Sequence, residues 1–144
     1  MQKKLIEREK SILTLLIYEK EKAYEQIKNE IKIEDFKSEI NKKILKKLYE
    51  EYEKGNSNIN NVLSYFNEDE EVMSRLTEIM ADEYKIKNDD KAIKNAINTY
   101  KIEKLDTRKM ELIEKQQMPG LSKEEEIAII QEINKIIIEK KLIK

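Results

Sequence analysis

Two clusters of acidic residues are the first places where this sequence could do chemistry. Residues 68–71 read Glu-Asp-Glu-Glu, and residues 124–126 are three glutamates. Carboxylate oxygens bind Mg²⁺, and a carboxylate can act as a general acid or base. Both clusters open predicted helices, however, where acidic residues stabilise the positive end of the helix dipole and cap free amides. We therefore interpret both clusters as structural and expect no catalytic, metal-binding or cofactor-binding residues.

The absence of histidine and cysteine removes several further kinds of chemistry. None of the 144 residues is His or Cys. This excludes a Ser-His-Asp triad, a thiol nucleophile, a disulfide and a His/Cys zinc site. Neither of the two glycines has a second glycine at the spacing of a phosphate-binding loop. The sequence therefore favours a binding module and gives no support to an enzyme.

A group of lysines is the remaining candidate for chemistry, because lysines can bind nucleic-acid phosphates. The group is Lys42, Lys43, Lys46 and Lys47. Several glutamates between residues 39 and 53 dilute it, and no aromatic residue is interleaved for base stacking. The chain as a whole has 29 basic and 30 acidic residues, so no net positive field recruits nucleic acid or an anionic membrane. We interpret the lysines as a solvated helix face and expect no direct nucleic-acid binding. A nucleic-acid-binding helical bundle is kept as an alternative.

The composition predicts an all-helical protein. Charged residues make up 41% and hydrophobic residues 39%, with two glycines and one proline. Helices are expected over residues 3–18, 20–30, 38–54, 62–66, 68–80, 89–117 and 122–143. The first has an apolar face interrupted only by Glu9. Between the second and third helices, Ile33 and Phe36 are expected to enter the core from a connector over residues 31–37.

Residue types at the helix ends support these boundaries. Ser38 and Ser122 are predicted N-caps, and Ser122 has capping-box spacing to Glu125. Asn88 is a further expected N-cap, with Asp89 in the first turn that follows it. The most apolar run, residues 12–17, is too short to span a bilayer. No signal peptide is visible at the N-terminus. We expect a cytoplasmic protein.

The long helix over residues 89–117 changes its apolar face part of the way along. Ala92, Ile93, Ala96, Ile97 and Tyr100 share one face, and Ile102, Leu105, Leu112 and Ile113 lie near the opposite face. At 100° per residue the shift is roughly half a turn. This predicts that the helix serves two neighbours in succession. The expected architecture is a helical bundle subdomain over residues 1–101 and a C-terminal helical hairpin over residues 102–144, joined through the long shared helix.

The last helix is apolar around roughly 260° of its circumference, far more than one neighbour requires. One stripe is Ile129, Ile133, Ile136 and Ile143, and the adjacent one is Ile127, Ile130, Ile137, Ile138 and Leu142. Either stripe could face outward. We assign the first to packing on Leu105, Leu112 and Ile113 inside the hairpin. The candidate partner-binding residues are then Ile127, Ile130, Asn134, Ile137, Ile138 and Leu142, with Lys141 at the rim. Weak self-association is a further expectation.

Several segments resemble a known family. They are residues 9–16 (EKSILTLL), residues 33–36 (IEDF), and the helix through residues 49–52 (YEEY) that ends at Gly55. The most distinctive is Gly120-Leu121-Ser122, followed by the acidic residues 124–126 and an apolar helix. Together they resemble the C-terminal, helicase-binding domain of bacterial DNA primase. The N-terminal domain of the replicative helicase shares the helical-bundle fold and a similar Asp-Phe connector, and it is kept as a second alternative.

The primase resemblance implies a function for each part of the chain. The hairpin would dock on the N-terminal domains of the hexameric replicative helicase and supply most of the affinity, and the bundle would modulate the helicase. Docking would couple primer synthesis to DNA unwinding. The zinc-binding and RNA-polymerising domains of a primase are not in this sequence, so the chain would be a non-catalytic part of that enzyme.

Overall fold

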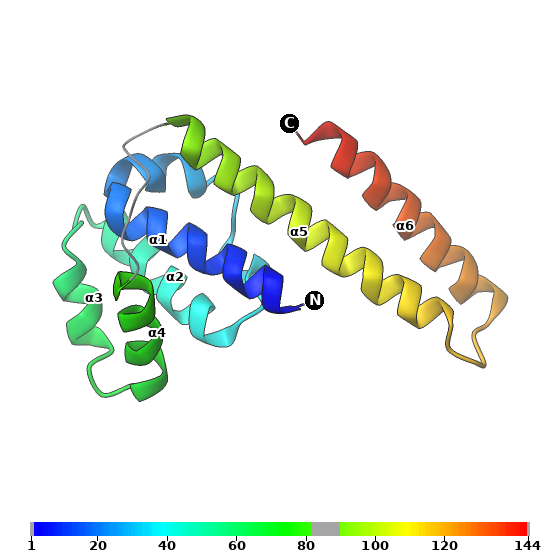
Figure 1. Ribbon diagram of the computed structural model, residues 1–144, viewed down its shortest axis with the longest axis horizontal. Helices are drawn as coiled ribbons and strands as arrows, with labels where there is room; N and C mark the ends of the chain where they lie inside the picture. The colour runs from blue at the N-terminus through cyan, green and yellow to red at the C-terminus, as the bar shows by residue number, and fades with distance from the viewer. Residues whose placement is uncertain (1, 82–89, 144) are drawn as a thin grey trace.

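The protein is all-helical, as predicted, in the computed structural model, which describes residues 2–81 and 90–143 (Figure 1). The described residues form six α-helices and one 3₁₀ helix, α1 (Gln2–Ile27), η1 (Ile33–Asp35), α2 (Glu39–Glu53), α3 (Ile59–Tyr65), α4 (Glu70–Ala81), α5 (Asp90–Gln116) and α6 (Lys123–Leu142). The predicted cap Asn88 and its neighbour Asp89 lie outside the described residues. Within the described ranges, no helix is both long and apolar enough to cross a membrane.

Helix α1 contains the break that separates the first two predicted helices. Helix α1 runs from Gln2 to Ile27, but it is kinked at Lys20, which has φ 52° and ψ −128°. A side chain with a Cβ rarely adopts a positive φ, and doing so costs about 1–3 kcal/mol. The break lies where the sequence predicts it, but the residue there is a lysine and not a glycine, so the backbone is strained.

Lys20→Gly is therefore expected to raise the free energy of unfolding by about 1 kcal/mol, because glycine adopts positive φ without steric strain. Lys20 is exposed, so the substitution removes no packing. Urea denaturation followed by circular dichroism measures the change. Glu25→Gly, at an exposed helical position in the same segment, is the control and should lose about 1 kcal/mol. Equal losses in both variants would refute the strain at Lys20.

The main hydrophobic core joins α1, α2, α3, α4 and the first half of α5. In Figure 1, α1 lies between α5 and α2. The fully or nearly fully buried side chains include Leu5, Ile12, Leu13, Leu16, Ile27, Ile31, Phe36, Ile44, Leu45, Leu48, Leu76, Ile93 and Tyr100. Phe36 is buried, as expected, and Ile33 packs partly buried against the same cluster. Ile31, at the start of the same connector, is also completely buried.

Three tyrosines of this core donate hydrogen bonds to backbone carbonyls and so link its elements. Tyr49 Oη donates to Ile31 O at 2.8 Å, and Tyr100 Oη donates to Asp35 O at 3.0 Å, so both hold the connector between α1 and α2. Tyr52 Oη donates to Leu16 O at the end of the straight part of α1. Burial raises the pKa of all three hydroxyls, that of Tyr52 to about 12.

These raised pKa values predict a loss of stability in alkali. A tyrosine in the unfolded chain ionises near pH 10, whereas the buried hydroxyl keeps its proton up to about pH 12 for Tyr52. The stabilisation is therefore complete below pH 10 and is lost between pH 10 and 12, by about 1.4 kcal/mol per pH unit for each such tyrosine. Urea midpoints measured across this range test the slope. Tyr52→Phe should flatten the slope, and an unchanged slope in that variant would contradict the assignment.

A buried carboxylate joins three helices of the bundle. Glu9 of α1 is completely buried and accepts hydrogen bonds from Lys37 N at 2.6 Å, Ser38 N at 3.3 Å and Asn41 Nδ2 at 3.0 Å. Asn41 Oδ1 in turn accepts from the guanidinium of Arg75 on α4. Glu9 therefore lies at the N-terminus of α2, where the helix dipole favours a negative charge.

The second hydrophobic cluster lies in the hairpin formed by α6 and the second half of α5. Leu112, Ile129 and Ile136 are its buried members, and Leu105, Leu121 and Ile133 pack against them partly buried. Figure 1 shows α6 running antiparallel beside α5, on the side away from the bundle. The apolar side chains of α5 thus belong to the bundle core up to Tyr100 and to the hairpin cluster from Leu105 onward.

The predicted half-turn shift along α5 is wrong in its size. Leu105 and Leu112, which contact α6, lie about 120° around the helix from the face of Ile93 and Tyr100. Ile102 and Ile113, on which the half-turn estimate depended, are only half-buried. Thr107, by contrast, keeps to the first face, where it is buried and lines a hollow with Lys4 of α1. Helix α5 therefore contacts α1 and α6 over the same turns and does not serve them strictly in succession.

Candidate functional site

The two acidic clusters lie at helix starts, as the structural interpretation predicts. Asp69 Oδ1 accepts from Val72 N at 3.2 Å at the start of α4. Ser122 and Glu125 form the predicted capping box, and the hydrogen bonds from Ser122 lower the pKa of the Glu125 carboxyl. Over residues 2–81 and 90–143, no three acidic side chains are grouped closely enough to hold a metal ion.

The strongest candidate site is the outer face of α6, opposite the face that packs on α5. Its large aliphatic side chains are exposed to solvent: Ile127 by 48%, Ile130 by 47%, Ile138 by 60% and Leu142 by 74%. Asn134, Gln131 and Lys141 are also exposed. We call this set of seven residues the free face. Monomeric proteins seldom leave a contiguous apolar surface exposed unless it binds something.

The structure separates the two stripes of the last helix. Ile129 and Ile136 are buried against Leu112, so the stripe assigned to the hairpin is the inner one. Six of the seven candidate partner-binding residues lie on the free face. The seventh, Ile137, is half-buried at its edge. Gln131 is the exposed member that the sequence analysis left out, although its position at 100° per residue, between Ile127 and Leu142, would have included it.

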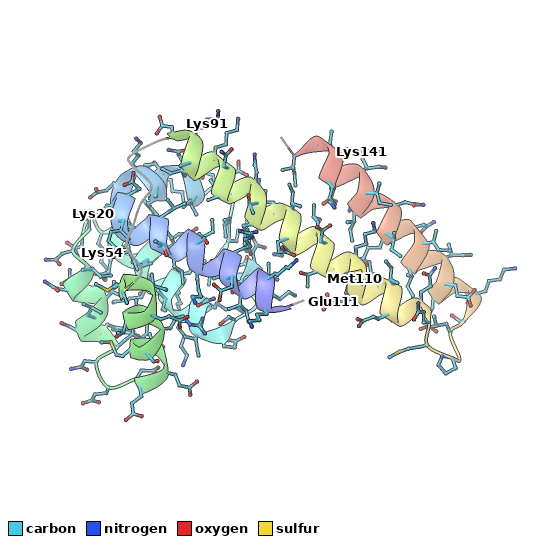
Figure 2. The ribbon with its side chains drawn as sticks, viewed as in Figure 1. Lys20, Lys54, Lys91, Met110, Glu111 and Lys141 are labelled. Carbon is cyan, nitrogen blue, oxygen red and sulfur yellow. The ribbon has the colours of Figure 1, made fainter. Side chains whose placement is uncertain are left out.

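Ion pairs fix the rotation of α6 about its own axis. Arg108 binds Glu132 with two hydrogen bonds, Nε to Oε2 at 2.7 Å and Nη2 to Oε1 at 3.2 Å. Lys140 Nζ lies 2.5 Å from Asp106 Oδ1. The hydrogen bonds from Arg108 lower the pKa of the Glu132 carboxyl. Because both pairs tie the inner side of α6 to α5, the free face points away from the hairpin. Figure 2 shows Lys141 at the end of α6 that lies nearer the bundle.

Where the hairpin leaves the bundle, further ion pairs hold α5 in place. Lys104 Nζ lies 3.0 Å from Asp35 Oδ1, and Lys101 pairs with Glu30. Both α5 residues also line a groove of about 540 Å³ between α5 and the C-terminal end of α6, together with Leu105, Arg108, Glu139, Leu142 and Ile143. All three cations of the groove have carboxylate partners, so their charges are already compensated.

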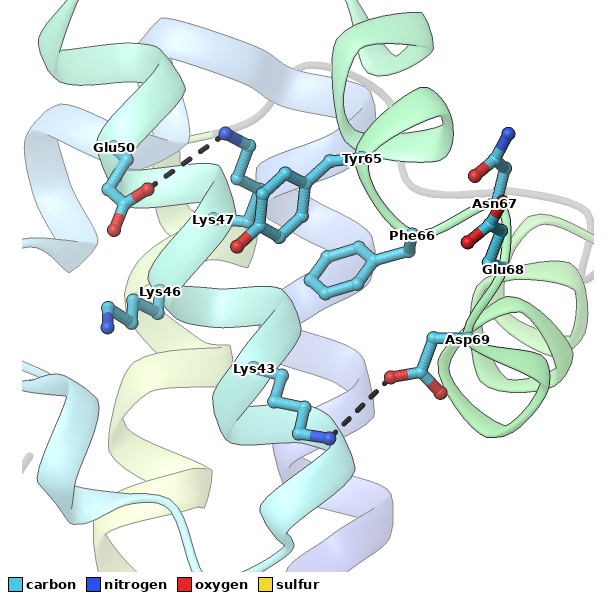
Figure 3. Close-up of a pocket in the computed structure, with 9 residues that line it drawn as sticks. All are labelled: Lys43, Lys46, Lys47, Glu50, Tyr65, Phe66, Asn67, Glu68 and Asp69. Carbon is cyan, nitrogen blue, oxygen red and sulfur yellow. Dashed lines mark ion pairs between the residues drawn. The ribbon is translucent and has the colours of Figure 1, made fainter.

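Three lysines of the group on α2 line a hollow, whereas the sequence predicts a solvated helix face. Lys43, Lys46 and Lys47 line a hollow of about 620 Å³ between α2 and the segment that joins α3 to α4 (Figure 3). Tyr65 of α3 is 64% exposed, and Lys47 Nζ lies 4.1 Å from the centre of its ring. No aromatic residue is interleaved among the lysines along α2, as the sequence shows, but Tyr65 of α3 lies beside them in the fold. Tyr65 was missed because it comes from a neighbouring helix, which no spacing rule within one helix can detect.

Acidic residues balance the lysines of this hollow. Glu50, Glu68 and Asp69 line the same hollow as the three lysines. Lys43 Nζ lies 3.6 Å from Asp69 Oδ2, and Lys47 Nζ lies 4.0 Å from Glu50 Oε2 and 3.4 Å from Glu51 Oε2. A polyanion would have to compete with these carboxylates, so the hollow ranks below the free face of α6 as a binding site.

The fold and the free face together define an all-helical bundle that carries a helical hairpin with an exposed apolar surface. No known protein family, curated protein or solved structure matches the chain.

Proposed function

We propose that this chain is a non-catalytic docking module that binds a protein partner through the free face of α6. The observation that best supports this proposal is that α6 buries one apolar stripe in the hairpin and leaves four large aliphatic side chains exposed on its other side. The resemblance to the helicase-binding domain of bacterial primase supplies the partner, the N-terminal domains of the hexameric replicative helicase in the cytoplasm. In this role the module couples primer synthesis to DNA unwinding.

The size of the free face suits a reversible complex. Complete burial of an Ile or Leu side chain contributes about 1.5–3 kcal/mol, and these side chains are already about half covered. Burial of four such side chains therefore contributes several kcal/mol to binding. The free-energy cost of association offsets part of this contribution. The expected affinity is micromolar, which suits a complex whose partners must bind and dissociate.

Deletion of residues 119–144 tests the role of the hairpin. The core of the bundle is formed by residues before Leu105, so the shortened chain is expected to stay folded. In a calorimetric titration into the replicative helicase of the same organism, the full chain should bind and the shortened chain should not. Circular dichroism of the shortened chain is the control. Binding by a folded shortened chain would move the docking surface to the bundle.

A second candidate function, binding of single-stranded nucleic acid, is favoured by the exposed ring of Tyr65 beside Lys43 and Lys46. Aromatic side chains beside lysines can stack bases while the lysines bind phosphates. Fluorescence anisotropy with a labelled oligonucleotide measures such binding. If this function is real, Tyr65→Ala and the pair Lys43→Glu with Lys46→Glu should each weaken binding, and added salt should weaken it further. Absence of binding by the unmodified chain at low salt would exclude it.

A further inference from the structure

We propose that the free face of α6 also binds a second copy of this chain, with the two α6 helices antiparallel about a twofold axis at Asn134. An interface between two identical copies must be complementary to itself. On the free face, residues are spaced symmetrically before and after Asn134. Ile130 and Ile138 lie four residues before and after Asn134, and Ile127 and Lys141 lie seven residues before and after it.

The antiparallel arrangement brings matching side chains together. Ile130 and Ile138 lie about 40° to opposite sides of Asn134, so Ile130 of one copy is level with Ile138 of the other but diagonal to it. Ile130 instead faces Ile137 of the second copy, and Ile138 faces Ile127. The two Asn134 side chains meet at the axis, where each amide can donate to the other and accept from it. A polar residue in a helix–helix interface costs stability but selects one register. If one α6 helix shifted along the other, both Asn134 amides would be buried without a partner.

Charge distinguishes this orientation from the parallel one. The first turn of α6 carries Glu124, Glu125 and Glu126, and the last turn carries Lys140 and Lys141. A parallel pair would place like charges together at both ends. In the antiparallel pair, Lys141 lies near Glu126 of the second copy, since both are on the side of Asn134 that carries Ile130. Neither Lys141 nor Glu126 forms an ion pair within the described residues, so each is available for this contact.

The position of α6 leaves room for the second copy. The helix lies on the side of α5 away from α1 and α2 (Figure 1). The free face is opposite the side chains Ile129 and Ile136, which are buried against Leu112 of α5. One helix face buries less than the 800 Å² or so per partner that is usual in a stable complex, so the dimer is weak and forms at high protein concentration. Because the dimer covers the free face, self-association and partner docking exclude each other.

Engineered cysteines test the register directly, because the natural chain has none. Under mild oxidation, Asn134→Cys alone should form a disulfide-linked dimer. Ile127→Cys and Lys141→Cys should cross-link readily when mixed and poorly when alone. Asn95→Cys, exposed on the bundle half of α5, is the matched control. Equal cross-linking of Asn134→Cys and Asn95→Cys would overturn the proposal, and so would strong cross-linking of Lys141→Cys alone, which indicates a parallel pair.

A charge exchange tests the same pairing without cross-linking. In sedimentation equilibrium, Lys141→Glu should raise the dimer dissociation constant about fivefold, and addition of Glu126→Lys should restore it. A chain that stays monomeric at millimolar concentration would overturn the dimer. A hexameric ring would also overturn it and would favour the helicase N-terminal domain as the family. Helicase binding by a strictly monomeric chain would leave the proposed docking function intact, so the two proposals fail separately.

Discussion

Glu9→Ala is expected to lower the free energy of unfolding by about 3–5 kcal/mol. The Glu9 carboxylate is the acceptor for Lys37 N, Ser38 N and the Asn41 side-chain amide. Removing it leaves these buried donors without an acceptor and loosens the contact of Asn41 with Arg75. The junction of α1, α2 and α4 loses its only buried carboxylate among the described residues.

Urea denaturation monitored by circular dichroism measures this loss. Glu7→Ala is the matched control, because Glu7 lies on the same helix, is exposed and, among the residues that the structure describes, pairs only with Lys10, at 3.3 Å. Exposed pairs of this kind contribute about 0–1 kcal/mol. Glu9→Gln should fall between the two, since an amide oxygen can replace part of the acceptor capacity. Similar losses in Glu9→Ala and Glu7→Ala would show that the buried network contributes little.

Ile136→Asp is expected to unfold the hairpin and leave the bundle folded. Ile136 is 4% exposed and packs with Leu112 and Ile129. Replacing it with aspartate removes an aliphatic side chain and places a charge among apolar groups, which together cost about 4 kcal/mol or more. The hydrophobic cluster of the hairpin has three buried members among the described residues, so the loss of one removes much of its stabilising free energy.

Hydrogen exchange resolves the effect by segment. In Ile136→Asp, amides of α6 and of the last turns of α5 should lose protection, and those of α1 and α2 should keep it. Ile138→Asp is the control, because Ile138 is 60% exposed on the free face and should cost less than about 0.5 kcal/mol. If Ile138→Asp exposed α6 as strongly as Ile136→Asp, the division of α6 into an inner face and a free face would be wrong.

Features that depend on local sequence were predicted well. Ser38 and Ser122 cap the helices as expected, and the helix that was expected to end at Gly55 does so, with φ 85° at that glycine. Such features are set by interactions within a few residues, which a single sequence displays directly.

Features that depend on distant contacts could not be predicted in this way. Glu9 interrupted an apolar face, and its three donors lie 28 to 32 residues further along the chain. Tyr65 reaches the lysines of α2 from α3. The angle between the two faces of α5 was overestimated because Ile102 and Ile113 were counted as core, although neighbouring helices cover them only partly. In each case the missing information is the placement of another helix.

Calorimetric titration of the double variant Ile130→Asp with Ile138→Asp into the hexameric replicative helicase is the most direct test of the docking proposal. Both side chains are exposed, so the variant should melt at the same temperature as the natural chain. The natural chain should bind with micromolar affinity, and the variant should bind at least about 100-fold more weakly, because two charges face an apolar surface. Equal binding by both chains would contradict the role of the free face, and no binding by the natural chain would contradict the helicase as partner.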